Sequence, residues 1–238
     1  AMSSVYQHTP GFSTGSTGPY EYFFNQDILI LTWTNVPADG RTISVPLSGQ
    51  SGLVSGIDVI KWDDDARVDI GSTNNYTVPN TGGTVTVTAK ITAYQGTTSG
   101  LGGTWTNGTY LTSVERVISP GASGFIYTTY YRAWGLNNLT NLSEAFKDCD
   151  NLLSVPVELP PSPNHPVTNL SSAFSGCTNF NQDISGWIVS NVSDMAEMFL
   201  NASTFQQNIS AWSTKNGASV TNMLSGATAM ALSLIHIS

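Results

Sequence analysis

The pattern of apolar and polar positions divides the chain into two parts. Over residues 22–135, runs rich in β-branched and aromatic residues alternate with Gly, Pro and Asn, which is typical of strands joined by turns. Over residues 136–231, large apolar residues return at a fixed interval, so that Phe174 and Phe199 lie 25 positions apart. We therefore expect a β-domain followed by a domain of repeats of about 25 residues.

Six runs in the first part predict strands. The last of them alternates apolar residues with Thr and Lys, which indicates one buried and one solvated face. Six short strands at this spacing favour an antiparallel β-sandwich. The runs are DILILTW, RTISVPL, SGIDVIKW, RVDIG, NNYTVP and GTVTVTAKITAY.

Each repeat begins with a polar residue at Asn141, Asn169 or Asp194, before an apolar run with helical spacing. Glu144 and Glu197 follow three positions later, a pattern that predicts a capped helical turn in each repeat. A short strand-like segment, DISGW or NISAW, comes next. We therefore expect a turn–helix–strand coil, an α/β solenoid in which stacked coils bury together what one coil cannot bury alone.

The repeated large side chains predict the core of this stack. An aromatic platform for sugars is the alternative interpretation of Trp187 and Trp212, but a repeated large apolar residue is more often core. Cys149 and Cys177 occupy equivalent positions, and we expect two buried free thiols rather than a disulfide. The residues predicted to be buried in register are Phe174, Phe180, Ile184, Trp187, Phe199, Phe205, Ile209 and Trp212.

Composition excludes several function classes. Charged residues make up 10% of the chain, the net charge is −8, and no run of Lys or Arg offers a surface for nucleic acid. No apolar stretch is long enough to span a membrane. His8, His165 and His236 lack a partner at metal-ligand spacing, and no nucleophile elbow, phosphate loop or zinc motif is present. We expect no enzyme and no cofactor.

One carboxylate cluster, Asp63, Asp64, Asp65 and Asp69, offers two interpretations. Several carboxylate oxygens suit Ca²⁺, which would make Asp63 and Asp65 the candidate ligands. The spacing of a calcium loop is absent, so a polar turn on an acidic surface is the favoured interpretation. Metal is therefore not expected to be needed for folding.

The predicted binding surface is a row of polar residues between the core positions of successive coils. These residues alternate with inward Ile and Trp, so that some of them must face solvent. Amides and hydroxyls suit hydrogen bonding to glycans or to protein loops. The row, called the polar ladder below, consists of Gln182, Asp183, Ser185, Gln207, Asn208 and Ser210.

Two resemblances extend this interpretation. VTNLSSAFSGCTNFNQDISGW and VSDMAEMFLNASTFQQNISAW resemble the repeat of BspA-like, leucine-rich-repeat-type surface proteins, also known from mycoplasma surface lipoproteins, over residues 139–230. IDVIKWDDDARVDIG and the strands after it resemble the polycystic-kidney-disease-type sandwich, although three Asp residues stand where that family has Gly-Asp-Gly after the Trp. The fold expected is an antiparallel β-sandwich followed by a leucine-rich-repeat-like solenoid.

The resemblance implies a non-enzymatic adhesion or binding module, secreted or displayed on a cell surface, whose partner is a protein or glycan on another surface. A virion fibre or receptor-binding protein is the alternative, and a hydrolase is a remote one. The chain has no Met at position 1 and no signal peptide, and residues 232–238 follow no local pattern. We expect a flexible segment at 1–21, a fragment of a longer protein, and a non-native tail.

Overall fold

The computed structural model describes residues 28–51, 59–64, 67–71, 74–92, 97–117, 139–159 and 166–230. The expectations for residues 1–21 and 232–238, and the expected domain boundary at 135/136, lie outside these ranges. The elements are β1 (Ile28–Asp39), β2 (Thr42–Ser44), β3 (Leu47–Ser51), β4 (Val59–Asp64), β5 (Arg67–Gly71), β6 (Asn75–Thr77), β7 (Asn80–Thr92), β8 (Thr97–Leu101), the 3-10 helix η2 (Gly108–Tyr110) and β9 (Leu111–Val117).

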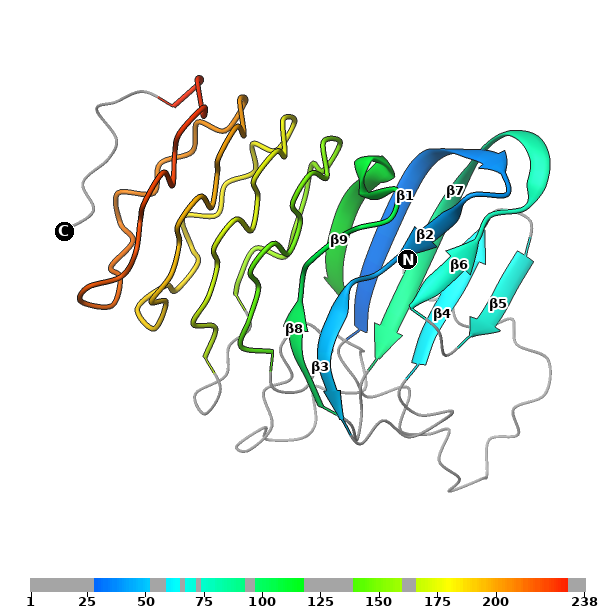
Figure 1. The fold of residues 1–238 in the computed structure, drawn as a ribbon, viewed down its shortest axis with the longest axis horizontal. Coiled ribbons are helices and arrows are strands. Elements are labelled where there is room, and N and C mark those ends of the chain that lie inside the picture. The colour runs from blue at the N-terminus through cyan, green and yellow to red at the C-terminus, as the bar shows by residue number, and fades with distance from the viewer. Residues whose placement is uncertain are drawn as a thin grey trace, which may run out of the picture.

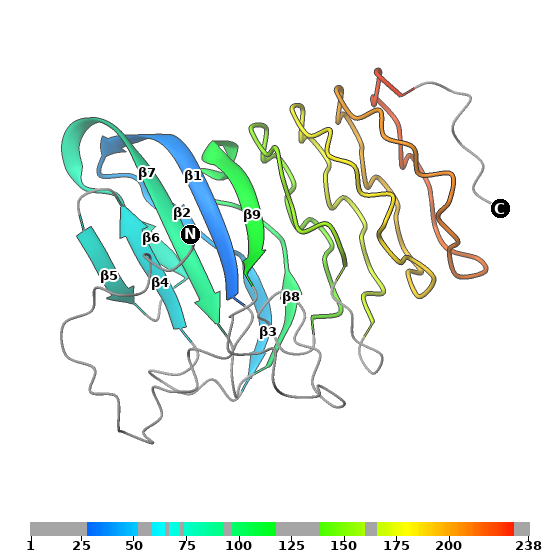
Figure 2. The same ribbon diagram turned by 180° about the vertical axis from the view of Figure 1, so that it is seen from behind.

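The first part of the chain is built from antiparallel strands. Five of them form one sheet in the order β5-β4-β7-β1-β9, and β2-β6 and β3-β8 form two smaller sheets. The small sheets lie on one side of the large sheet in both views (Figures 1 and 2). Each of the six predicted runs contains a strand, and β3, β8 and β9 are three further strands that were not predicted.

Strand β1 shows how alternation places the core between these layers. Leu29, Leu31 and Trp33 are fully buried, each two positions after the last. The alternation breaks at Asn35, where φ is 55° and the pairing with β7 shifts register before Val36. This β-bulge returns apolar side chains to the core side over the second half of the strand.

Beyond β9 the described chain forms four stacked turns, named here the first coil (139–159), second coil (166–190), third coil (191–215) and last coil (216–230). Parallel bridges connect equivalent positions along the stack: Gly100–Asn141, Asn141–Asn169, Asn169–Asp194 and Asp194–Ser219. The coils lie side by side along the long axis of the molecule (Figure 1).

The coil backbone is a run of turns, and the predicted helices are wrong. Within 143–148, alternate N–H groups bond to the carbonyl three residues earlier, as Lys147 does to Glu144 at 3.2 Å. The intervening N–H groups instead donate to the next coil, as Phe146 does to Ala173 at 2.8 Å. Glu144 has a φ of 56°, which an α-helix does not allow. The part of the chain that the structure describes contains no α-helix.

The predicted capping box is half right. Asn141 accepts a hydrogen bond from the N–H of Ser143 at 2.9 Å, as a helix cap would, although the turn that it closes is not followed by a helix. Glu144 does not return the bond, and it accepts from the Lys147 ammonium at 2.9 Å. The Glu144 N–H donates to the Ser171 carbonyl of the second coil at 2.8 Å, so the neighbouring coil satisfies this group instead of a helix cap.

The register of the last coil also differs from its sequence alignment. Aligning VTNM at 220–223 with VSDM at 192–195 predicts an interval of 28 residues. Met195 instead donates its N–H to the Ser219 carbonyl at 2.8 Å, and Phe199 donates to Met223 at 2.8 Å. Each bond joins residues 24 apart, as the bond from Leu170 to Asp194 does between the second and third coils. The paired positions Asp194 and Ser219 are 25 apart, so the repeat interval is 25 and not 28. The turn around 217 absorbs no insertion.

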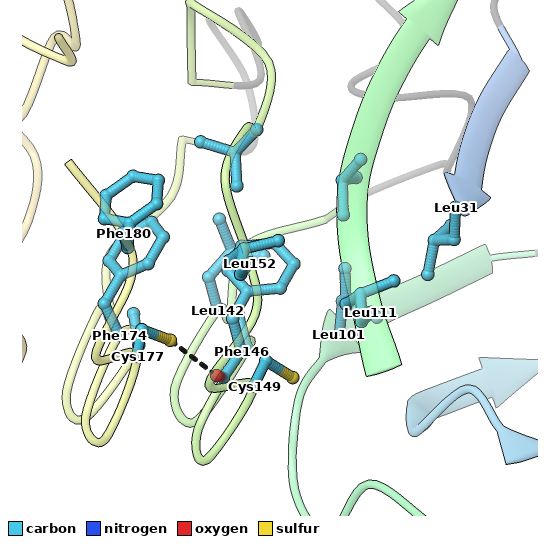
Figure 3. Close-up of a cluster of buried hydrophobic side chains, with 14 of the residues drawn as sticks. Leu31, Leu101, Leu111, Leu142, Phe146, Cys149, Leu152, Phe174, Cys177 and Phe180 are labelled. Atoms are coloured by element: carbon cyan, nitrogen blue, oxygen red, sulfur yellow. Dashed lines mark hydrogen bonds between the residues drawn. The ribbon is translucent and has the colours of Figure 1, made fainter. Parts of the chain in front are cut away.

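One continuous cluster of buried apolar residues runs from Leu29 in β1 to Met223 in the last coil. Leu101, the last residue of β8, and Leu111, the first residue of β9, lie across from the first coil, which contributes Leu142 and Phe146 to the same cluster (Figure 3). Phe174 and Phe199 stack at 5.5 Å with 4° between their planes. All eight residues that the sequence predicted as core are buried: Phe174, Phe180, Ile184, Trp187, Phe199, Phe205, Ile209 and Trp212.

Candidate functional site

Each coil contains one run of turns, called its turn run below, at 143–148, 171–176, 196–201 or 221–226. The polar ladder lies on the segments 181–187 and 206–212, which follow the turn runs of the second and third coils. Ile184 and Trp187 point into the core, and Asp183 and Ser185 on either side of Ile184 are exposed. One coil on, Asn208 and Ser210 are exposed in the same way. The predicted alternation is therefore present at these four positions. Gln182 and Gln207 are only partly exposed.

Both Gln side chains hold adjacent coils together. The Gln182 Oε1 accepts from the Val155 N–H at 2.6 Å, and its Nε2 donates to the Val155 carbonyl at 2.9 Å. The Gln207 Nε2 donates to the Asn181 carbonyl at 2.7 Å and to its Oδ1 at 2.9 Å. These amides complete backbone hydrogen bonding between coils, a role that the sequence interpretation missed. The repetition of Gln at an interval of 25 residues is the sequence signal that could have indicated this role.

Asp183 and Asn208 close local turns. The Asp183 Oδ1 accepts from the Ser185 N–H at 2.9 Å, and the Asn208 Oδ1 accepts from the Ser210 N–H at 3.0 Å. The hydrogen bonds from Ser185 lower the pKa of the Asp183 carboxyl, because they favour its charged form. Asp183 and Asn208 thus fix the shape of the surface, and the exposed Ser185 and Ser210 hydroxyls lie beside them.

The two tryptophans are core residues and do not form an aromatic platform. Trp187 is 3% exposed and Trp212 is 5% exposed. The Trp187 Nε1 donates to the Pro156 carbonyl of the first coil at 3.1 Å. The structure provides no such partner for the equivalent Trp212 Nε1 among the residues it describes. Neither ring presents a face to solvent, so stacking on a sugar is excluded at these positions.

Cys149 and Cys177 are free and fully buried, as predicted. The Cys177 Sγ donates to the Phe146 carbonyl at 2.9 Å (Figure 3). The Cys149 Sγ faces Gly108, where an added Cβ would lie 3.2 Å from the sulfur. Burial raises the pKa of both thiols well above the ordinary value, so neither is a nucleophile at neutral pH.

The calcium candidates lie outside the side chains that the structure describes. Asp65 lies outside the described residues, and Asp63 and Asp69 are described only as backbone of β4 and β5. His8, His165 and His236 lie outside as well. Within the described ranges no three His, Cys, Asp or Glu side chains gather where they could hold a metal ion. The interpretation of Asp63 and Asp65 as a polar turn remains a prediction.

One charged group that sequence reasoning missed joins β1 to η2. The Arg41 guanidinium pairs with both carboxylate oxygens of Asp39 and donates to the Tyr110 hydroxyl at 2.8 Å. The hydrogen bond from Arg41 lowers the pKa of Asp39 to about 2. Every polar group named in this cluster has a partner within it, which indicates a structural tie.

Comparison with known proteins supplies one match. Residues 126–236 match the model of a family described as Mycoplasma protein of unknown function, DUF285. This range covers all four coils and less than half of the chain. No curated protein and no solved structure matches the chain. No helix in the described ranges is long and apolar enough to cross a membrane.

Proposed function

We propose that this chain is a non-enzymatic binding module of a secreted or surface-displayed protein. In this proposal a β-sandwich supports a leucine-rich-repeat-like solenoid, and the solenoid recognises a protein or glycan on another surface. The observation that carries the proposal is the outward face of segments 181–187 and 206–212. This face recurs in the second and third coils and exposes Asp183, Ser185, Asn208 and Ser210 above a closed core.

Stacked coils favour recognition for a physical reason. The core positions are filled by Phe, Ile and Trp, so exposed positions can change without loss of packing. Hydroxyl, amide and carboxylate groups on this face can form hydrogen bonds, and few basic groups are present to attract anionic polymers. The only thiols of the chain, Cys149 and Cys177, are buried, which agrees with a role other than catalysis.

The family match adds support for the surface location. The matched family is described by its occurrence in Mycoplasma and not by an activity. The repeat sequence resembles BspA-like surface proteins over the same coils. Together these observations favour display outside the cell, with the binding partner on a host or neighbouring surface.

The test changes the exposed hydroxyls and leaves the amides that hold the coils together. In one variant, Ser185→Glu and Ser210→Glu place two charges on the ladder. In a matched control, Thr168→Glu and Ser225→Glu place two charges at exposed positions near the turn runs. We expect the ladder variant to lose binding to a glycan array or to intact cells while the control binds as the natural chain does. Equal binding by two folded variants would overturn the proposal for this face.

A further inference from the structure

The chain contains two Asn-Gly dipeptides, Asn107–Gly108 and Asn216–Gly217. Asn is among the thermolabile residues of proteins. A following Gly exposes its backbone nitrogen, because it has no Cβ to block an approach. The two dipeptides differ in burial and in hydrogen bonding, so that the structure distinguishes between them chemically.

Asn216 and Gly217 lie in a solvent-exposed turn at the start of the last coil. Both residues are exposed, and nothing lies within 4 Å of the position of a Cβ on Gly217. The Ala218 N–H donates to the Lys215 carbonyl at 2.9 Å, and Gly217 has a φ of 78°. These features define a tight turn with Gly at its third position. The Asn216 amide forms no hydrogen bond with any residue that the structure describes.

Asn107 is held by the surrounding structure. Its Nδ2 donates to the Thr42 carbonyl at 2.6 Å, and its backbone occupies the left-handed region at the start of η2. Gly108 is buried, and an added Cβ would lie 2.6 Å from the Trp105 Cβ. Attack on the Asn107 side chain would require breaking the hydrogen bond from its amide to the Thr42 carbonyl and turning the backbone of η2.

We propose that Asn216 is a site of spontaneous deamidation in the folded protein and that Asn107 is protected. The Gly217 backbone nitrogen attacks the Asn216 side-chain carbonyl carbon, and the new C–N bond closes a succinimide ring. The bond from that carbon to the side-chain nitrogen breaks, and the nitrogen leaves as ammonia after taking the proton of the Gly217 N–H. Water from the solvent then opens the ring at either carbonyl. The product is Asp at one opening and isoaspartate at the other, and no oxidant or reductant takes part.

The position of Asn216 gives the reaction a structural consequence. Ser219, three residues on, attaches the last coil by donating to the Ser193 carbonyl at 3.0 Å and accepting from the Met195 N–H at 2.8 Å. Isoaspartate lengthens the backbone by one carbon in the turn that sets this register, and a carboxylate replaces a neutral amide. The reaction therefore loosens the last coil from the third.

The first experiment compares both sites in one sample. The natural chain is incubated folded in mildly alkaline buffer, and the same chain is incubated in denaturant; peptide mapping by mass spectrometry then separates Asn, Asp and isoaspartate forms. We expect similar conversion of both sites in the denatured chain. In the folded chain Asn107 should react more slowly than Asn216 by a factor of at least about ten. A local opening of η2 that costs ~1.4 kcal/mol is enough to give this ratio. Equal rates at the two sites, or no conversion at Asn216 while the denatured chain reacts, would overturn the proposal.

The second experiment tests the loosening. Hydrogen exchange is measured on the N–H groups of Met195, Glu197, Phe199 and Asn201, which donate into the last coil. We expect faster exchange in the aged natural chain and no change on ageing in the Asn216→Gln variant, whose longer side chain forms the ring poorly. Unchanged exchange in a sample rich in isoaspartate would show that the last coil does not depend on this turn.

Discussion

At the scale of single residues, the left-handed conformation determines the shape of the coils. Each turn run has two residues with positive φ, four positions apart, such as Glu144 and Asp148 in the first coil. The second of these is Asp148, Gly176, Asn201 or Gly226, residue types that tolerate this conformation well. This recurrence was visible in the sequence, and it opposed the helix that apolar spacing predicted.

Gly102 shows the closest approach between the sheets and the coils. Its φ is 144°, and an added Cβ would overlap the Ser143 carbonyl oxygen and lie 2.9 Å from the Ala145 nitrogen. Both contacts are with backbone of the first coil, which a side-chain rotation cannot relieve. The neighbouring Gly103 has a φ of 123°, but only the Pro46 Cβ lies within 4 Å of its Cβ position, at 3.9 Å.

We predict that Gly102→Ala destabilises the chain more than Gly103→Ala. Both variants strain a positive φ, at a cost of about 1–3 kcal/mol each. Gly102→Ala adds overpacking against the first coil, which costs about 1–3 kcal/mol more. Denaturant unfolding of both variants measures the difference in the free energy of unfolding. Equal losses would show that the first coil does not press against Gly102.

At the scale of elements, each coil is held by its neighbours and not by its own hydrogen bonds alone. Alternate N–H groups of the turn run donate to the next coil, as Gly176 does to Leu200 at 2.8 Å. Outside the turn runs, a side chain can supply the hydrogen bonds between coils. Gln182 does so for the backbone N–H and carbonyl of Val155. Within 153–159, Val155 and Pro156 bond to side chains of the second coil, whereas Leu153 and Ser154 bond to the backbone of β9.

We predict that Gln182→Ala lowers the free energy of unfolding by about 1–3 kcal/mol, because it leaves the buried Val155 N–H and carbonyl without their partner. Ser185→Ala is the control, since this exposed hydroxyl lies on the same segment. Thermal or denaturant unfolding compares the two variants. If Gln182→Ala were neutral, the amide would be free to serve as the binding group that the sequence suggested.

At the scale of the whole molecule, one core connects the sheets to the coils. The Trp105 ring lies 6.2 Å from Trp33 and 6.5 Å from Phe146, and its Nε1 donates to the Ala145 carbonyl at 2.9 Å. The Val114 N–H of β9 donates to the Ser154 carbonyl at 2.9 Å. The sheets thus cover the first coil, which would otherwise expose an apolar face.

We predict that Phe199→Ala costs about 3–5 kcal/mol, as truncation of a buried aromatic side chain does. Its ring lies 5.5 Å from Phe174 and 3.9 Å from Phe205, so the cavity would open in the middle of the stack. Leu200→Ala, at the next and only partly buried position, should cost less. Chemical denaturation of both variants tests this ranking, and the reverse order would contradict the observed inward face.

The sequence by itself determined six of the nine described strands of the first part and the buried positions of the coils. Both depend on residue type repeating with a period, and burial of large side chains such as Phe174 and Trp212 follows from that period. Only the tertiary structure decided the turn runs, the register of Ser219 and the use of Gln182. In each case the hydrogen-bond partner belongs to a coil about 25 residues away, and no local pattern reports which backbone groups that coil presents.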